Sequence, residues 1–175
     1  MKDRLNQIAN EVGTWAARNF PVHAPDLGML EETGELCHCF LKRAQKIRGF
    51  DNPEHFLEHA TDAIADIAVY NSHFIFLSKI PLESDPVCRP GLDLTDIRGI
   101  RRLFSRMTHD VSSILSGALN RAGRPLPLCI LDHLVTVSDA IEIDFMETLE
   151  MTWAKVKQRD WAKNRESAHL VNENP

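Results

Sequence analysis

The sequence predicts an all-α protein. Apolar residues recur every three to four positions along most of the chain, which is the spacing of one buried helix face. Signals for β-structure are weak: the 175 residues include a single Tyr, no stretch alternates apolar with polar residues, and no Asn-Gly or Asp-Gly turn marks a hairpin. We therefore expect an up-and-down bundle of helices.

Two helices are expected in the N-terminal part. The first covers about residues 2–19, where apolar side chains follow the helical spacing. A proline-containing segment at 20–25 then interrupts the pattern. The second helix covers about residues 26–43, with Asp26 as its N-cap because a short acidic side chain can accept a backbone N–H there.

The middle of the chain predicts two more helices. The third covers about residues 53–79, and Pro53 suits its first turn because a helix start needs no N–H from that residue. Residues 83–92 contain two prolines and a glycine, which indicates a loop. Residues 97–118 again follow the helical spacing and form the fourth expected helix.

The C-terminal part contains a last helical region that ends near Trp161. The pattern is compatible with a start near Leu126 or near Ser138. We expect residues 1–162 to form a single helical domain and residues 163–175 to form a polar tail.

Composition narrows the class of protein. The chain is 43% apolar and 26% charged, as expected for one globular domain with its own core. It has no apolar stretch long enough for a membrane span and no signal-like start, so a cytoplasmic protein without a membrane partner is expected. The four cysteines form no C-x-x-C pair and should be reduced. The net charge of −5 argues against a partner such as long nucleic acid.

Two helical stripes of acids indicate a metal site. Glu31, Glu32 and Glu35 lie within the second expected helix, and Asp62 and Asp66 lie one turn apart in the third. Carboxylate oxygens suit Mg²⁺ or Mn²⁺, which leave some positions to water and phosphates. The alternative interpretation is that these acids only cover a solvated helix face, and spacing alone does not choose between the two.

At these residues the chain resembles the MazG-like branch of the all-α nucleoside triphosphate pyrophosphohydrolases. Residues 30–36 (LEETGEL) are similar to the Glu-x-x-Glu half of the family pattern, and residues 62–67 (DAIADI) to its second half. Flanking similarity at 15–20, 41–49 and 152–161 extends the resemblance to about two-thirds of the chain. Residues 81–128 match nothing in the family and are expected to insert an extra helix before the C-terminal one.

The resemblance implies roles for the acids. By position, Glu32, Glu35 and Asp66 would be metal ligands, and Glu31 and Glu32 would be the catalytic residues, with Glu31 an extra ligand or the base for the attacking water. The sequence has Ala63 where the family places the first acid of its second motif. Asp62, which is four residues from Asp66 and on the same helix stripe, is expected to replace it as a ligand.

The family also implies the reaction. A Mg²⁺-dependent enzyme (Mn²⁺ is the alternative ion) would hydrolyse nucleoside triphosphates between the α and β phosphates, giving a nucleoside monophosphate and pyrophosphate, in nucleotide-pool house-cleaning. Members of this family typically build their active sites in dimers or larger assemblies, so a homodimer or homotetramer is expected. Candidate substrate-binding residues are Trp15 and Asn19 for the base and Lys42, Lys155 and Arg159 for phosphate oxygens. The alternatives are a core position for Trp15, which its place on the apolar stripe of the helix favours, a helix cap for Asn19, and solvated or paired side chains for the three basic residues.

Two other classes remain open at this point. A di-iron carboxylate bundle would use the Glu35-x-x-His38 spacing, but it needs a second such motif, and the other instance is Glu166-Ser-Ala-His169 in the expected tail. A non-catalytic helical oligomeric interaction or regulatory module would retain the acids as a solvated face or as a degenerate nucleotide or metal site.

Overall fold

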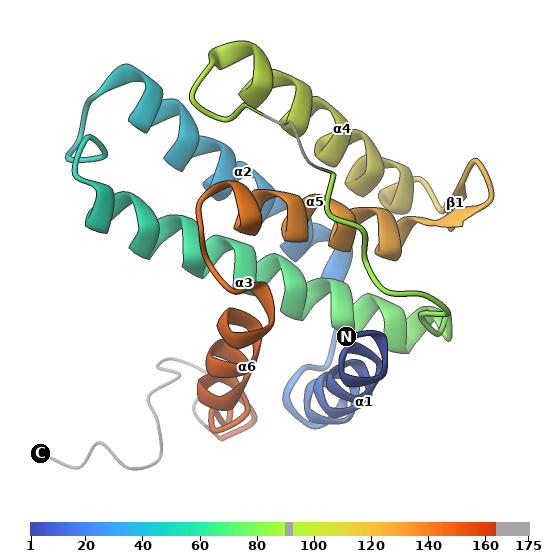
Figure 1. The fold of residues 1–175 in the computed structure, drawn as a ribbon. Coiled ribbons are helices and arrows are strands. Elements are labelled where there is room, and N and C mark those ends of the chain that lie inside the picture. The colour runs from blue at the N-terminus through green and yellow to red at the C-terminus, as the bar shows by residue number, and fades with distance from the viewer. Residues whose placement is uncertain (90–92, 164–175) are drawn as a thin grey trace, which may run out of the picture.

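The computed structural model describes residues 1–89 and 93–163, and helices make up most of this part of the chain (Figure 1). The all-α class is therefore confirmed. The elements, in chain order, are α1 (Lys2–Asn19), α2 (Pro25–Gln45), α3 (Pro53–Ser78), α4 (Ile97–Leu115), β1 (Asn120–Arg121), β2 (Arg124–Pro125), α5 (Leu126–Ala140) and α6 (Phe145–Val156).

The first three helices lie close to where the apolar spacing predicts them. The expected N-cap of α2 is wrong, however, because Ala24 occupies that position and Asp26 lies in the first turn. Pro25 is the first residue of the helix, where its fixed backbone angle suits the start. An acid in the first turn remains favourable there because the N–H groups at a helix start carry partial positive charge.

The last helical region consists of two helices. The expected start near Leu126 matches the first residue of α5, but this helix ends at Ala140. The second helix, α6, begins at Phe145, after the alternative start near Ser138. The Asp144 carboxylate accepts the backbone N–H of Glu147 at 2.9 Å and so caps α6. Two helices, α4 and α5, therefore stand between α3 and α6, where the sequence predicts one.

A two-residue β-hairpin joins α4 to α5, which the sequence did not indicate. Asn120 pairs with Pro125, and Arg121 pairs with Arg124. The turn residues Ala122 and Gly123 both have positive φ, at 49° and 79°. Such two-residue turns usually begin with Asn or Asp. Because Ala122 occupies that position, the sequence has no Asn-Gly or Asp-Gly pair to predict the hairpin.

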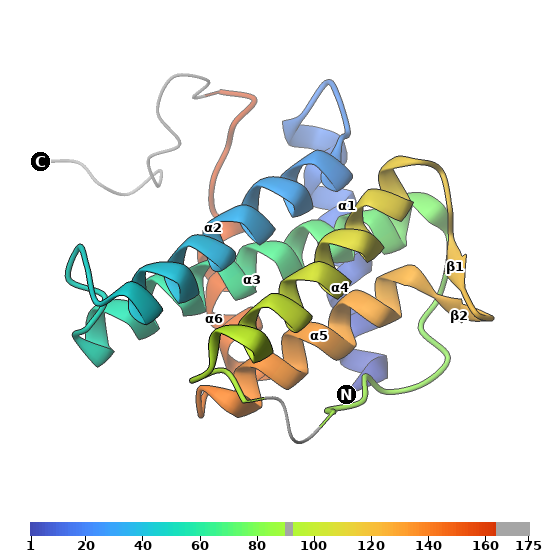
Figure 2. The same ribbon diagram turned by 90° about the horizontal axis from the view of Figure 1, so that it is seen from above.

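Four of the helices form a bundle. In Figures 1 and 2, α2, α3, α4 and α5 run side by side, and they contact one another in the closed order α2, α3, α5, α4. Helices α1 and α6 cross the bundle on the outer side of α3. The simple up-and-down bundle expected from the sequence therefore describes α2 to α5 but not α1 and α6. No helix in the described part of the chain combines the length and the apolar character needed to cross a membrane.

An aromatic cluster packs three helices of this bundle together. The rings of Phe40 on α2 and Phe56 on α3 meet edge to face with centroids 5.1 Å apart, and Phe104 on α4 lies 5.8 Å from Phe40. All three side chains are buried. Burying a Phe contributes about 1.5 to 3 kcal/mol, so this contact fixes α4 against the α2/α3 pair.

The four cysteines are free and do not form disulfides, as expected. Cys39 and Cys129 are buried, and Cys37 and Cys88 are half-buried. Burial raises the pKa of the Cys39 thiol to about 11, which keeps it protonated at neutral pH. These residues therefore behave as small core side chains.

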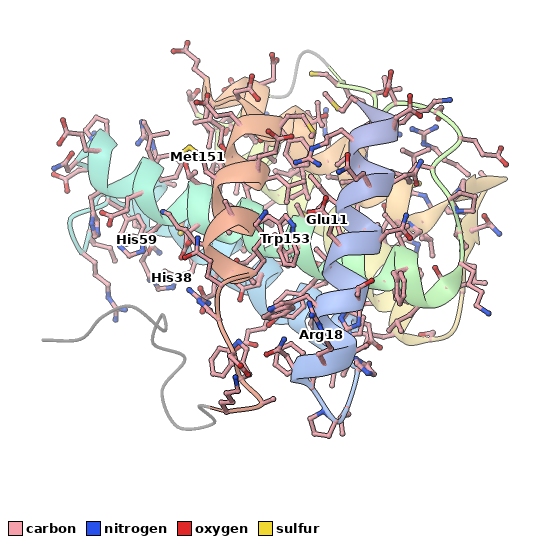
Figure 3. All side chains as sticks on the ribbon, turned by 90° about the horizontal axis from the view of Figure 1, so that it is seen from below. Glu11, Arg18, His38, His59, Met151 and Trp153 are labelled. Atoms are coloured by element: carbon pink, nitrogen blue, oxygen red, sulfur yellow. The ribbon has the colours of Figure 1, made fainter. Side chains whose placement is uncertain are left out.

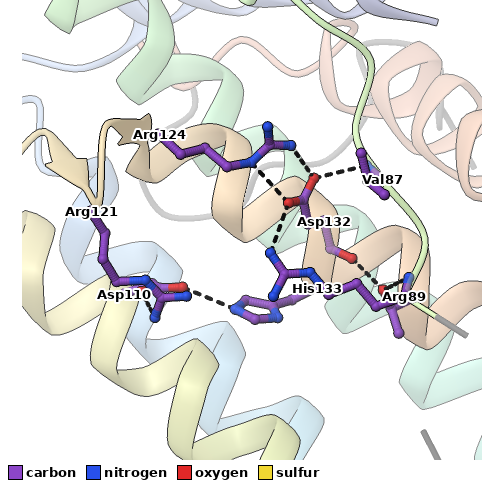
Figure 4. Close-up of polar contacts among 8 residues, drawn as sticks. Val87, Arg89, Asp110, Arg121, Arg124, Asp132 and His133 are labelled. Carbon is purple, nitrogen blue, oxygen red and sulfur yellow. Dashed lines mark hydrogen bonds and ion pairs between the residues drawn. The ribbon is translucent and has the colours of Figure 1, made fainter. Parts of the chain in front are cut away.

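Two buried carboxylates hold the hairpin and the segment that follows α3 against α4 and α5 (Figure 4). Asp132 on α5 accepts two hydrogen bonds from the Arg124 guanidinium, at 2.7 and 3.0 Å. It also accepts the backbone N–H of Val87 at 2.8 Å and lies 3.4 Å from an Arg89 nitrogen. Asp132 is only 1% exposed, so these partners take the place of water.

Asp110 on α4 is the second of these carboxylates and is fully buried. One of its oxygens lies 2.7 Å from Arg121, and the other lies 2.9 Å from Nε2 of His133 on α5. The contact joins α4, the hairpin and α5 at one point. We refer to Asp110, Asp132 and the residues paired with them as the buried charge network.

Close packing of α2 on α3 leads to a first prediction. A Cβ at Gly28 would lie 2.4 to 2.6 Å from three ring atoms of Tyr70, closer than real contacts allow. We expect Gly28→Ala to lower the free energy of unfolding by about 1 to 3 kcal/mol, because the Tyr70 ring or the helix that carries it must shift. Urea unfolding followed by circular dichroism measures this change.

Gly34 in the same helix provides the matched control for Gly28→Ala. A Cβ at this position meets nothing within 4 Å, and the glycine has a helical backbone. Gly34→Ala should therefore stabilise the protein by up to about 1 kcal/mol, since alanine favours helix. Equal effects of the two substitutions would contradict the steric account of Gly28.

Candidate functional site

The α2/α3 pair brings the two predicted acidic stripes together. Glu31, Glu32 and Glu35 lie on α2, and Asp62 and Asp66 lie on α3, which runs antiparallel beside it (Figure 2). Glu32 and Asp66 are half-buried, whereas the other three side chains are exposed. We refer to these five residues as the acidic cluster.

The pKa values show that the members of the acidic cluster affect one another. Burial raises the pKa of Glu32 to about 7, with further contributions from the negative charges of Asp66, Glu35, Glu31 and Asp62. Burial, together with the charges of Asp62 and Glu35, raises the pKa of Asp66 to about 6. The five carboxylates therefore share one region of negative potential.

One cation acts on this region from outside the two helices. The charge of Arg159, in the turn after α6, lowers the pKa of Asp66 and so opposes the effect of burial. No ion pair neutralises a member of the acidic cluster within the described residues. The negative charge is thus largely uncompensated.

The donor chemistry of the cluster suits a divalent cation, but its side chains are not arranged as a finished site. Within residues 1–89 and 93–163, no three His, Cys, Asp or Glu side chains are placed to hold a metal ion. Carboxylate oxygens are nevertheless the ligands that Mg²⁺ and Mn²⁺ prefer. Glu35 and Asp62 are exposed, so their side chains can change rotamer rapidly, and a bound cation would require them to turn towards Glu32 and Asp66.

Trp15 and Asn19 hold the turn that carries Arg159. The indole N–H of Trp15 donates to the Arg159 carbonyl oxygen at 3.1 Å, and the ring meets Trp153 edge to face at 5.8 Å. Asn19 donates to the Trp15 carbonyl oxygen at 2.9 Å and accepts the Trp161 N–H at 2.8 Å. Both residues, which were candidates for contacting a base, anchor the segment after α6 to α1. Trp15 is buried, as its place on the apolar stripe of α1 indicates.

The predicted residue Lys155 lies on a groove between α3 and α6. This α3/α6 groove has a volume of about 690 Å³, and its lining includes Asp62 and His59 from α3 and Met151 from α6. Figure 3 shows His59 and Met151 from the side on which α6 crosses α3. Lys155 and Asp62 thus share a concave surface that borders the acidic cluster.

Lys42 lies apart from the other predicted basic residues. Its ammonium group donates to the side chain of Gln45 one turn later, at 3.3 Å. It does not contribute to the pKa shifts of Glu32 or Asp66. The second motif of the di-iron interpretation, Glu166–His169, lies outside the described residues.

Tyr70 belongs to the site although the sequence pattern did not single it out. Burial raises its pKa, and the charges of Glu32, Asp66 and Glu31 raise it further. The phenol therefore stays protonated and has an O–H to donate. Its position four residues after Asp66 was the available signal, because this spacing places both side chains on one helix face.

The fold and the site together define an all-α protein with an acidic cluster between two antiparallel helices. No protein-family model, curated protein or solved structure matches the chain. The acidic cluster and the sequence motifs within it are therefore the features that indicate a function.

The raised pKa of Glu32 predicts a pH-dependent stability. A carboxyl group whose pKa is higher in the folded state binds more protons when folded, so stability falls as the pH rises from about 4.5 to about 7. Glu32→Gln, which is neutral at every pH, should be about equal to the wild type at pH 5 and more stable by roughly 1 to 2 kcal/mol at pH 8.

The measurement is urea unfolding of both proteins in EDTA at the two pH values. Burial lowers the pKa of His73 to about 4, which changes the stability in the opposite direction between pH 4 and 6.5. This effect cancels when the variant is compared with the wild type at each pH. A stability difference that stays constant between pH 5 and pH 8 would contradict the prediction.

Proposed function

We propose that the protein is a Mg²⁺-dependent nucleoside triphosphate pyrophosphohydrolase that cleaves between the α and β phosphates. The observation that carries the proposal is the convergence of five carboxylates from α2 and α3 without an ion-pair partner among the described residues. Such a cluster is costly as a structural feature, because half-buried like charges repel. It is useful where a cation and a polyphosphate bind together.

The fold supports the ligand set in one respect. Ala63, at the position where the MazG-like pattern has an acid, is 3% exposed and packs in the core. Asp62 instead lines the α3/α6 groove beside the cluster. The proposed ligands are therefore Glu32, Glu35, Asp62 and Asp66.

In the proposed mechanism the side chains have different chemical roles. A bound Mg²⁺ would supply charge neutralisation at the phosphate oxygens. Glu31, exposed at the edge of the cluster, accepts the proton of the attacking water, and Glu32 assists as a neighbouring carboxylate. Arg159 and Lys155, which flank the aspartates from the α6 side, hold phosphate oxygens through charge-assisted hydrogen bonds.

The groove provides room for the substrate. Its volume of about 690 Å³ lies within the roughly 300 to 1,000 Å³ that is usual for small-molecule pockets. Met151, 57% exposed on its rim, is an apolar side chain that a second copy or a nucleotide base would cover. The proposal includes a homodimer or homotetramer in which this rim is covered, and light scattering measures its mass.

The test uses a panel of ribo-, deoxyribo- and modified nucleoside triphosphates with purified protein and Mg²⁺. Phosphate is measured with and without added inorganic pyrophosphatase. Phosphate that appears only with pyrophosphatase establishes cleavage between the α and β phosphates. Phosphate without it shows a different cleavage, and no phosphate from any member of the panel favours a non-catalytic interaction or regulatory module; either result overturns the proposal.

A further inference from the structure

The outer face of α4 carries an unusual set of charges. Arg98, Arg101, Arg102 and Arg106 are all exposed, and Arg98 has a side chain that is 88% accessible. At 100° per residue these four positions fall within about 140° of the helix circumference. We refer to them as the arginine face.

No carboxylate balances the arginine face along its length. The one acid within α4 is Asp110, which is fully buried and paired with Arg121 and His133. Asp96, just before the helix, lies 3.7 Å from Arg98, whereas the other three arginines form no ion pair with a described residue. The net charge of −5 argues against nucleic-acid binding by the chain as a whole, but it does not exclude binding by this one strongly cationic ridge.

The charges oppose what helix stability favours. The N-terminal end of a helix carries partial positive charge, so acids stabilise its first turns and cations destabilise them. Asp96 caps α4 by accepting the Arg98 N–H at 3.3 Å, but the first turn itself has no acid, and three arginines lie in the first six residues of the helix. One capping carboxylate does not balance three arginines near this end, whereas an anionic partner would neutralise them.

The chemistry of the face indicates which anion it fits. All four cations are arginines, whose planar guanidinium groups bind phosphate with two hydrogen bonds. Ser105, His109 and Ser112 are exposed on the same side and supply further donors. Arg98, Arg102 and Arg106 follow one another at steps of about 6 Å along the axis, so the ridge contacts several phosphates of a linear chain.

The fold argues for nucleic acid over a membrane. A helix that binds at a membrane surface inserts its apolar face, but the apolar face of α4, including Leu103, Phe104 and Met107, is buried in the core. The arginine face also has no Phe, Tyr or Trp side chain on which a base could stack. The contacts available are those to the sugar-phosphate backbone.

We propose that the arginine face of α4 binds the phosphate backbone of nucleic acid without sequence preference. This site is separate from the acidic cluster, which lies between α2 and α3. Contacts to three or four phosphates would make the binding weak and strongly dependent on salt. The face would hold the protein near nucleic acid while leaving the proposed catalytic site free.

The experiment measures fluorescence anisotropy with labelled 20-nucleotide single strands and duplexes of two unrelated sequences. We expect equal affinity for the two sequences and a log–log slope against salt between about −2 and −4. The variant R101Q/R102Q/R106Q should weaken binding at least tenfold and reduce this slope by about 2. Its helix content should be unchanged, because glutamine favours helix nearly as well as arginine does. Its triphosphate hydrolysis should also be unchanged, because the arginine face is separate from the acidic cluster.

The matched control removes three cations from the opposite side of the molecule. R18Q/K157Q/K163Q lowers the net charge equally but acts near α1 and α6, far from α4 in Figure 1, and should change binding less than twofold. An equal loss in the control, no binding at 25 mM salt, or binding only to vesicles that contain phosphatidylserine would each overturn the proposal. Hydrolysis is measured separately, so failure of the proposed catalytic function is distinguishable from failure of this one.

Discussion

Glu35→Gln is expected to abolish Mg²⁺-dependent turnover and to leave the fold intact. Glu35 is exposed on α2, and its charge raises the pKa of both Glu32 and Asp66, so it lies within reach of both helices of the site. Replacing the carboxylate with a neutral amide removes a hard anionic ligand. Substituting a residue that only hydrogen-bonds to a metal ligand typically lowers metal affinity or activity about 10- to 100-fold. Loss of a ligand itself should therefore lower the turnover by at least about 100-fold.

Three measurements test the Glu35 prediction. Pyrophosphate release gives the turnover, calorimetric titration with Mn²⁺ gives the affinity, and circular dichroism gives the helix content. Glutamate and glutamine have similar helix propensities, so the helix content should not change. An unchanged rate would remove Glu35 from the site.

Glu147→Gln is the matched control. Glu147 lies on α6 and is exposed, it does not line the α3/α6 groove, and it is not among the charges that raise the pKa of Glu32 or Asp66. We expect less than a threefold change in turnover. Equal losses at Glu35 and Glu147 would indicate a general effect of surface charge, in conflict with a defined ligand set.

Asp132→Ala is expected to produce the largest loss of stability, about 3 to 5 kcal/mol. The substitution leaves the Arg124 guanidinium and the Val87 N–H without their acceptor at a site that is 1% exposed. Removing one partner of a buried ion pair is costly because the remaining charge is poorly hydrated. The hairpin and the segment that follows α3 should then separate from α5.

Urea unfolding measures the Asp132 effect, and two variants define its cause. Asp132→Asn retains one acceptor oxygen and should lose less stability than the alanine variant. Glu83→Ala removes an exposed carboxylate from the segment that follows α3 and should stay within about 0.5 kcal/mol of the wild type. A loss below 1 kcal/mol in Asp132→Ala would show that solvent replaces the buried charge network.

The candidate site was largely predictable because its acids follow helix geometry. Glu31 and Glu35, like Asp62 and Asp66, are four residues apart, and this spacing places each pair on one helix face whatever the tertiary structure. Trp15 and Asn19 were harder to interpret. Their residue types suit both base recognition and structural hydrogen bonding, and only the position of the segment after α6 shows that they contact its backbone.

The sequence by itself determined the all-α class and the extent of α1 and α3, because a periodic apolar face and proline positions are local signals. Tertiary structure decided the rest. It decided the crossing of α1 and α6, the pairing of Asp110 with Arg121 and His133, and the convergence of α2 and α3 that makes the acids interact. These features depend on packing between residues far apart in the chain, and helix periodicity carries no information about which faces meet.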